Sequence, residues 1–178
     1  SQKIAASQSS LAQAQHIARI GSWNWSFLSN HLVWSEEMYH IFGRTTGGPV
    51  DSFSDFQEYF SAEEWVAFSK KEKKAILKNQ DFELETHVLR PDKTQRMVIT
   101  RGKVRTAQNE EVIQIVGITQ DVTEQKLADE KVRVLFRAIE QSPISVVITD
   151  SAGKIEYVNP KFCSLTGYTL QEAIGQNP

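Results

Sequence analysis

The sequence contains little cysteine and no long apolar run, and each shortage excludes a class of protein. Its single cysteine, Cys163, excludes a disulfide framework within the chain and a zinc site built from thiolates. A reducing, cytoplasmic setting is the simplest interpretation. No stretch approaches the roughly 20 apolar residues of a membrane span, and no signal peptide opens the chain. We therefore expect no membrane contact within this chain, while a membrane anchor in a longer parent protein stays open.

The chain also lacks an excess of either charge. Its 20 basic and 22 acidic residues give a net charge of -2, and no basic block occurs. We therefore expect no nucleic-acid partner, because such a partner requires clustered positive charge. The lysine-rich run at residues 70–74 is expected to be the solvated outer face of a helix.

The first 80 residues predict short helices around a pair of strands. The elements are a helix over 8–20 that ends at Gly21, strands at 22–27 and 32–34, a short helix at 38–42, a helical segment around 53–60 and a long helix at 63–79. Residues 47–49 are expected to form a loop. We expect the long helix to direct four apolar side chains inward, namely Trp65, Phe68, Ile76 and Leu77.

After residue 80 the apolar period changes to two, which is typical of strands. Strands are predicted at 82–89, at 96–105 and from residue 112 onward. A segment of roughly 110 residues can bury about two-thirds of its unfolded surface, so a real core is expected. Together the elements predict an α+β domain with one antiparallel sheet and its helices on one face.

The last of these strands leads directly into a helix over 124–140, and residues 117–126 form the junction. Asp121 and Thr123 stand at the changeover, where short oxygen-bearing side chains accept hydrogen bonds from the free amides of a helix start. With Asp121 as the cap, Glu124 has the spacing of a capping box. We therefore select Asp121 and Thr123 as candidate signal-coupling residues.

Four segments together resemble a PAS domain with its PAC-type C-terminal strands: residues 17–25, 34–43, 89–93 and 117–124. The last resembles the family's Asp-Ile-Thr motif, here with Val122 in the middle. Lys93 stands where the family usually has glycine, and residues 59–64 lack the usual His and Pro. The resemblance covers residues 17–126 and implies a five-stranded antiparallel sheet with short helices on one face.

The chain then repeats the pattern of its own beginning. Residues 144–158 predict two strands, and residues 159–168 predict a capped short helix closed by Gly167. This is similar to the start of a second PAS domain. We expect an N-terminal helical extension at 1–20, a PAS domain at 21–122, a signalling helix at 123–141 and a truncated second PAS domain at 142–178. Half a sheet cannot bury its own apolar face, so the last part is expected to pack against something else.

A ligand pocket is the first candidate site. Its candidate lining residues are aromatic, namely Trp25, Trp34, Phe42 and Phe56, within a wider group that includes Trp23, Phe53 and Phe60. Ordinary core packing is the alternative. We expect either no cofactor or a small-molecule ligand, with flavin as a further alternative.

Catalytic and metal sites are not expected. The four histidines lack the spacing of a metal pair, and the long helix, where haem-binding relatives often place the iron ligand, contains none. Cys163 does not match the cysteine segment of flavin-linked light sensors, and its spacing is that of a small buried apolar residue. No set of nucleophile and base is present, so we expect no enzyme within this chain.

The junction helix carries apolar residues at heptad spacing. Val132 and Ile139 lie seven residues apart, with Ala128 and Leu135 at the intervening positions. The pattern predicts a homodimer through a short coiled coil, and packing of the same face onto the sheet is the alternative.

The resemblance implies a sensory module of a bacterial or archaeal signalling protein of the histidine kinase or diguanylate cyclase type. Its output domain would lie downstream in the same chain, and the helix would relay a ligand or partner signal. The rival hypotheses are a dimerisation or docking module without a ligand, and a flavin redox sensor.

Overall fold

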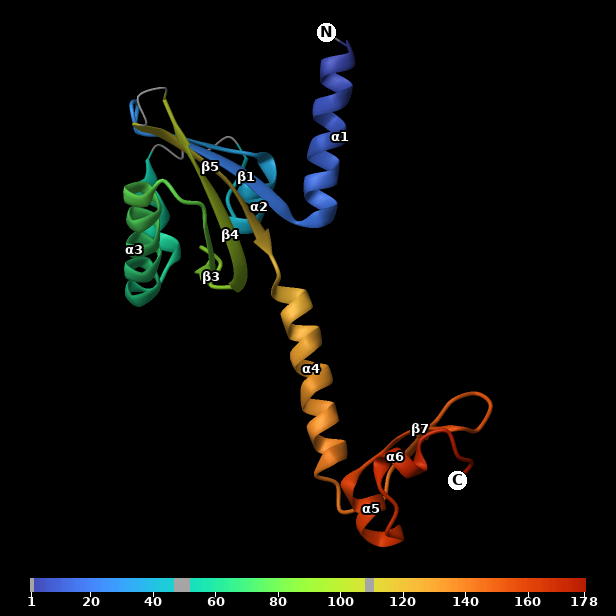
Figure 1. The fold of residues 1–178 in the computed structure, drawn as a ribbon. Helices are drawn as coiled ribbons and strands as arrows, with labels where there is room; N and C mark the ends of the chain where they lie inside the picture. The colour runs from blue at the N-terminus through green and yellow to red at the C-terminus, as the bar shows by residue number, and fades with distance from the viewer. Residues whose placement is uncertain (1, 47–51, 108–110) are drawn as a thin grey trace. The chain divides into compact units, whose positions relative to one another are not determined.

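The computed structural model describes residues 2–46, 52–107 and 111–178. They divide into two compact units, the first ending at Glu124 and the second comprising residues 125–178. Each unit is described by itself below, with the labels of Figure 1. Within the described residues no helix is both long enough and apolar enough to cross a membrane.

Unit 1 contains a five-stranded antiparallel sheet in the order β2-β1-β5-β4-β3. The strands are β1 (Ile20–Ser26), β2 (His31–Trp34), β3 (Phe82–Leu89), β4 (Gln95–Thr106) and β5 (Val112–Asp121). The first and last strands of the unit, β1 and β5, are neighbours at its centre. The two ends of the unit therefore lie side by side, which brings the residues after α1 next to the start of the junction helix (Figure 1).

The helices of unit 1 are α1 (Gln2–Ala18), α2 (Glu36–Phe42), the 3-10 helix η1 (Phe53–Tyr59) and α3 (Ala62–Lys78). Side chains from α2, η1 and α3 join those of the strands in one apolar cluster, so these three helices cover the same face of the sheet. This confirms the predicted α+β fold. The predicted loop at 47–49 lies outside the described residues.

The predicted helix end at Gly21 is wrong. Helix α1 ends at Ala18, Arg19 adopts a left-handed conformation with φ 53°, and Gly21 already belongs to β1. A Cβ at Gly21 would lie 2.5 Å from the Cγ atom of Met38 and 2.8 Å from its backbone nitrogen. Glycine is required here because α2 crosses close to the strand, which the local sequence does not reveal.

A second close approach shapes the centre of the core. The strand register places four residues in one row across the sheet, namely Trp23, Gly117, Gly102 and Phe82. A Cβ at Gly117 would lie 2.3 Å from the Trp23 ring, and one at Gly102 would lie 2.3 Å from the Phe82 ring. The two aromatic rings therefore occupy the space above a pair of side-chain-free positions.

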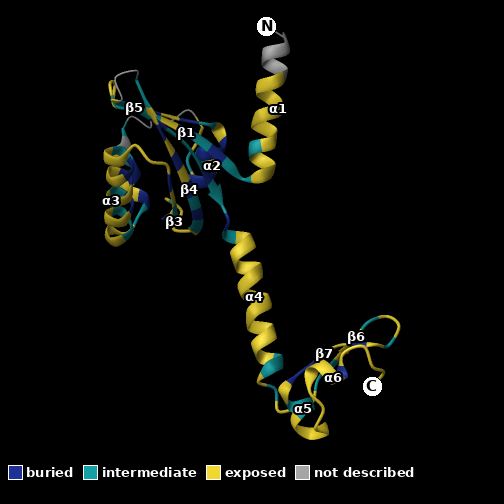
Figure 2. Cartoon of the chain, in the orientation of Figure 1, coloured by how far each residue is buried: buried dark blue, intermediate teal, exposed yellow. Residues whose placement is uncertain are grey.

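Helix α3 is oriented differently from the prediction. Phe68 is buried and Trp65 and Ile76 pack against the core, as expected, but Leu77 is 86% exposed. The buried face instead continues through Glu72, which lies within the lysine-rich run and is 4% exposed. Phe68, Glu72 and Ala75 follow the helical period, and the four lysines around Glu72 are exposed (Figure 2).

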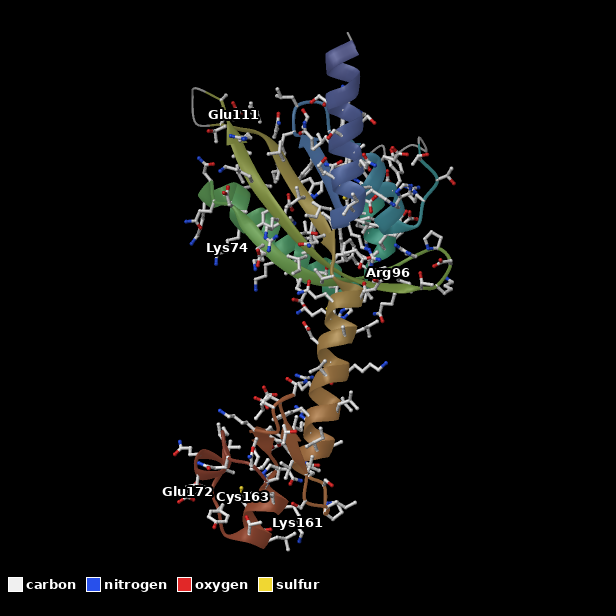
Figure 3. The ribbon with its side chains drawn as sticks, turned by 90° about the vertical axis from the view of Figure 1, so that its right-hand side faces the viewer. Lys74, Arg96, Glu111, Lys161, Cys163 and Glu172 are labelled. Atoms are coloured by element: carbon white, nitrogen blue, oxygen red, sulfur yellow. The ribbon has the colours of Figure 1, made fainter. Side chains whose placement is uncertain are left out.

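Unit 2 consists of most of α4 (Thr123–Glu140), followed by β6 (Val147–Thr149), β7 (Ile155–Val158), α5 (Pro160–Thr166) and α6 (Leu170–Ala173). The two strands pair antiparallel, and α6 was not predicted from the sequence. Ile155, Val158 and Ala173 form a small core, against which the half-buried Cys163 packs (Figure 3).

Asn159 holds unit 2 together. It is fully buried, and its Oδ1 accepts hydrogen bonds from the backbone nitrogens of Val146 (2.9 Å) and Phe162 (3.1 Å). Its Nδ2 donates to the carbonyl oxygens of Ile139 and Ile144, each at 3.0 Å. One side chain therefore caps α5 and fastens it to the C-terminal end of α4.

Candidate functional site at the junction of β5 and α4

The first turn of α4 is hydrogen-bonded to the neighbouring strand β4. Thr123 Oγ1 accepts a hydrogen bond from the backbone nitrogen of Met97 at 2.9 Å and lies 2.5 Å from Asp121 Oδ1, to which its hydroxyl donates. Asp121 Oδ1 also accepts from the backbone nitrogen of Thr123 at 2.9 Å. The backbone nitrogen of Val122 donates to the Met97 carbonyl oxygen at 2.9 Å. The start of the helix is therefore bonded to both backbone groups of Met97 on β4.

The same turn is bonded to the residue between α1 and β1. The backbone nitrogen of Asp121 donates to the carbonyl oxygen of Arg19 at 3.0 Å, and the Arg19 guanidinium pairs with the Glu124 carboxylate at 2.8 Å. The hydrogen bond and charge of Glu124 raise the pKa of Arg19. Only one half of the predicted capping box is present. The Asp121 side chain accepts a hydrogen bond from the Thr123 backbone nitrogen at the helix start, as predicted. The second half is wrong, because the Glu124 carboxylate pairs with Arg19 and the Asp121 backbone nitrogen donates to the Arg19 carbonyl oxygen.

Asp121 is a buried carboxylate between two arginines. Its side chain is 6% exposed, and its Oδ2 lies 4.0 Å from Arg90 and 3.9 Å from Arg96. Arg90 also donates to the carbonyl oxygens of Ile41 (2.8 Å) and His40 (3.0 Å), at the end of α2. Burial lowers the pKa of Arg90. Because a buried charge needs partners, these contacts connect α2, the β3–β4 turn and the junction in one network.

A cleft of about 240 Å³ opens beside this network. Its lining residues come from α1 and the residue after it, α2, the β3–β4 turn, β4, the end of β5 and the start of α4, and Arg96 on β4 is labelled in Figure 3. The lining residues are His16, Arg19, Glu37, His40, Ile41, Arg90, Arg96, Asp121 and Glu124.

The candidate aromatic residues do not all lie together. Trp34, Phe42 and Phe56 form one packed group with ring centroids 4.9–5.2 Å apart, which is contact distance for aromatic rings. Trp25 instead lies against Phe27 at 4.4 Å, and its Nε1 donates to Asn30 Oδ1 at 3.2 Å.

Two buried indole nitrogens in this core, Nε1 of Trp23 and Nε1 of Trp34, have no hydrogen-bond partner among the described residues. Buried donors of this kind are usually satisfied, so they mark where a polar ligand atom or a water could lie. The side chain of Phe53 lies outside the described part of the chain.

Comparison with known proteins identifies the fold. A family model described as PAS fold matches residues 31–119, which is half of the chain. The chain belongs to the PAS family. A second PAS fold model matches residues 134–178.

The relatives of this PAS chain are regulatory proteins. It is 25% identical over 172 residues to the probable diguanylate cyclase DgcE of Escherichia coli K12, with 91% of this chain and 15% of that protein covered. It is 29% identical over 137 residues to a blue-light-activated histidine kinase of Brucella ovis, covering 77% of this chain and 27% of the kinase. A nitrogen fixation regulatory protein of Klebsiella pneumoniae is 40% identical over 45 residues, covering 25% and 9%. The chain spans less than a third of each of these relatives.

Solved PAS structures show the same fold. A sensory box histidine kinase/response regulator from Burkholderia thailandensis superposes with a TM-score of 0.58 at 19% identity, covering 74% of this chain and 98% of that one. The N-terminal domain of a diguanylate cyclase with PAS/PAC sensor from Marinobacter aquaeolei gives 0.53 at 17% identity, covering 60% and 98%. These likenesses confirm the five-stranded antiparallel sheet with its helices.

One departure from the PAS pattern has a visible structural consequence. Lys93, at the position where glycine is usual, adopts a left-handed conformation with φ 69°, and its backbone nitrogen donates to the Arg90 carbonyl oxygen at 2.9 Å. The β3–β4 turn requires that conformation, which costs a residue with a Cβ about 1–2 kcal/mol. The family's preference for glycine therefore has a direct backbone cause here.

Proposed function

We propose that this chain is the sensory and relay module of a longer signalling protein. Unit 1 would receive a ligand or partner signal, and α4 would carry it to an output domain in the same polypeptide, of the histidine kinase or diguanylate cyclase type. The observation that carries the proposal is the Thr123 hydroxyl, which joins the first turn of α4 to β4 through Met97. The regulatory character of the relatives supports it. No catalytic step is assigned to the chain itself.

The relay would work as a mechanical coupling. Because Thr123 is bonded to β4 and Asp121 to Arg19, a shift of β4 or of the turn after α1 changes the direction in which α4 leaves the sheet. An 18-residue helix is about 27 Å long, so a small tilt at its start produces a larger displacement at its end. Asp121 and Thr123 are the proposed coupling residues.

For the input, the aromatic core is the proposed receiving region. The two unpartnered indole N–H groups of Trp23 and Trp34 suit a small molecule with hydrogen-bond acceptors. Flavin is a weaker candidate, because Trp34, Phe42 and Phe56 contact one another and because the only cysteine lies in unit 2.

The proposed division of the chain follows from the sequence: an N-terminal extension at 1–20, a PAS domain at 21–122, the signalling helix at 123–141 and the start of a second PAS domain at 142–178. Helix α4 carries no buried residue, and Figure 2 shows it exposed along most of its length. Val132 and Leu135, on its heptad seam, are 67% and 58% exposed. We propose that a second copy of the chain covers this seam in a homodimer.

Native mass spectrometry tests the input and the dimer together, because it reports the ligand mass and the oligomeric state. We expect a dimer that Leu135→Glu dissociates. Arg137→Glu, which places the same carboxylate on the opposite side of α4, is the matched control and should leave the dimer intact. A monomeric wild-type chain would overturn the homodimer. A ligand-free dimer would favour the rival function, a docking module without a small molecule.

The relay is tested in the longer protein. Replacing Asp121 with Ala should uncouple the output from the input. The stability cost should exceed the roughly 0.5–2 kcal/mol of a lost helix cap, because Arg90 and Arg96 also lose a buried charge partner. If regulation of the output survives this change intact, the junction is a helix cap and no more.

A further inference from the structure

Two histidines and a glutamate from separate helices meet near the end of α1. His16 lies in the last turn of α1, whereas Glu37 and His40 lie three residues apart on α2. The Oε2 atom of Glu37 is 2.8 Å from His16 Nδ1 and 3.2 Å from His40 Nδ1. One ligand atom from each residue lies within 4.8 Å of the other two. We propose that His16, Glu37 and His40 bind one divalent transition-metal cation, of which Zn²⁺ is the representative.

The chemistry of the donors fits such an ion. Imidazole nitrogen and carboxylate oxygen are Zn²⁺ ligands, and three protein ligands with one open position are a common arrangement. The His16 side chain is 70% exposed and that of His40 is 46% exposed, so solvent reaches the cluster and a water can complete the coordination. The mixture of nitrogen and oxygen donors disfavours Ca²⁺ and Mg²⁺, which prefer oxygen.

The distances also fit. Bonds of about 2.0–2.2 Å in tetrahedral geometry place two ligand atoms about 3.3 Å apart. The nitrogen–oxygen separations of 2.8 and 3.2 Å are within about half an ångström of this value. Two of the three pairs of ligand atoms therefore already have nearly the separation that the ion requires, and the third pair lies within 4.8 Å.

Burial of Glu37 separates this cluster from an ordinary group of surface side chains. The Glu37 side chain is 7% exposed, and its Oε2 faces both imidazole rings. A buried carboxylate is costly unless a positive charge or hydrogen bonds compensate it. The hydrogen bonds to the two imidazole rings compensate it in part, and a cation held by all three groups would do so more fully.

The surrounding charge does not oppose a cation. The same cleft contains three arginines, Arg19, Arg90 and Arg96, together with two further carboxylates, Asp121 and Glu124. Including Glu37, the formal charges in the cleft balance before any metal enters. An added divalent cation therefore meets no net positive charge in the cleft.

The position of the site gives it a consequence. His16 is three residues before Arg19, whose carbonyl oxygen and guanidinium contact Asp121 and Glu124. The cation would join the last turn of α1 to α2 and so fix the residue against which α4 begins. This effect on the helix rests on the proposed relay, whereas binding of the cation does not.

The test is a titration of the metal-free chain, prepared without a histidine tag, with Zn²⁺ by isothermal calorimetry. We expect one ion per chain. In His16→Ala the affinity for Zn²⁺ should fall by more than about 100-fold, because loss of even a residue that hydrogen-bonds to a metal ligand lowers metal affinity by about 10–100-fold. His16 is exposed, so this variant keeps its fold, which circular dichroism verifies. His31→Ala, which removes an exposed histidine on β2, is the matched control and should bind as the wild type does.

Three results would overturn the site. They are no stoichiometric binding by the wild-type chain, equal binding by His16→Ala, and one ion per two chains, which would place the metal between copies. Substitution with Co²⁺ gives an independent readout, because nitrogen and oxygen ligation in tetrahedral geometry produces visible absorption that His40→Ala should abolish. None of these results depends on a ligand in the core or on regulation of an output domain, so failure of the metal site and failure of the relay are distinguishable.

Discussion

Glu72 provides a quantitative test of the packing of α3. Its carboxyl group lies on the buried face of the helix, beside the opposing charge of Lys73. Burial raises the pKa of Glu72 from 4.5 to about 7, and the charge of Lys73 opposes that shift. We consider the substitution Glu72→Gln, which keeps the size of the side chain and removes its ionisation.

The sign follows from proton linkage. The folded pKa of Glu72 lies above the unfolded one, so between pH 4.5 and about 7 the folded state binds more protons. The wild-type protein therefore loses stability as the pH rises through this window and loses no more above it. The full shift corresponds to about 3 kcal/mol at most, and partial solvation reduces it, so we expect Glu72→Gln to stabilise unit 1 by about 1–3 kcal/mol at pH 8.

The assay is urea unfolding followed by tryptophan fluorescence. All four tryptophans lie at or before residue 65, so the signal reports on unit 1 alone. The gain from Glu72→Gln should be close to zero at pH 4.5 and reach its full value by pH 8. Glu63→Gln, on the exposed face of the same helix, is the control and should change stability by less than about 1 kcal/mol at either pH. A gain independent of pH, or a loss at pH 8, would refute the assignment of Glu72 to the core.

Four further substitutions test single contacts and backbone conformations. Gly117→Ala should destabilise unit 1 by at least about 1–3 kcal/mol in urea unfolding because its Cβ would lie 2.3 Å from the Trp23 ring. Trp23→Phe should lower the free energy of unfolding less in the Gly117→Ala protein than in the wild type. If the effects of the two substitutions simply add, the close contact between the two positions is refuted. Lys93→Gly should raise the stability of unit 1 by about 0.5–1 kcal/mol by relieving the left-handed turn, whereas a loss would show that the turn is not strained. Asn159→Ala should cost unit 2 more than about 2 kcal/mol, measured by far-ultraviolet circular dichroism, because four backbone groups lose their partner; unchanged unfolding would refute its role.

Features that depend on residues close together in the sequence were predicted well. Features that depend on contacts between residues far apart in the sequence were predicted less well. Helix α3 is an example of the first kind: a long helix was predicted at 63–79, and it begins at Ala62, where Ser61 and Glu64 form a capping box within one turn. The capping box expected at the junction failed because the Glu124 carboxylate pairs with Arg19, which is distant in sequence. Gly21 was misassigned for the same reason, since its requirement comes from Met38 on another element.

The candidate sites follow the same rule. Asp121 and Thr123 were located from the changeover of strand and helix patterns, but their contact with Met97 required the strand order. The cluster of His16, Glu37 and His40 was missed, because its members come together only through the packing of α1 on α2. A spacing of three residues between an acidic residue and a histidine was the one local signal available.

The most direct test of the relay is amide hydrogen exchange in Thr123→Val, which keeps the shape of the side chain and removes its hydroxyl group. If Thr123 joins α4 to β4, exchange at the Met97 amide and in the first turn of α4 should both accelerate roughly tenfold. The amides at the C-terminal end of α4, where Asn159 is bonded, should be unchanged and serve as the internal control. Faster exchange at Met97 with no change in α4 would contradict the account, because the strand and the helix would then move independently.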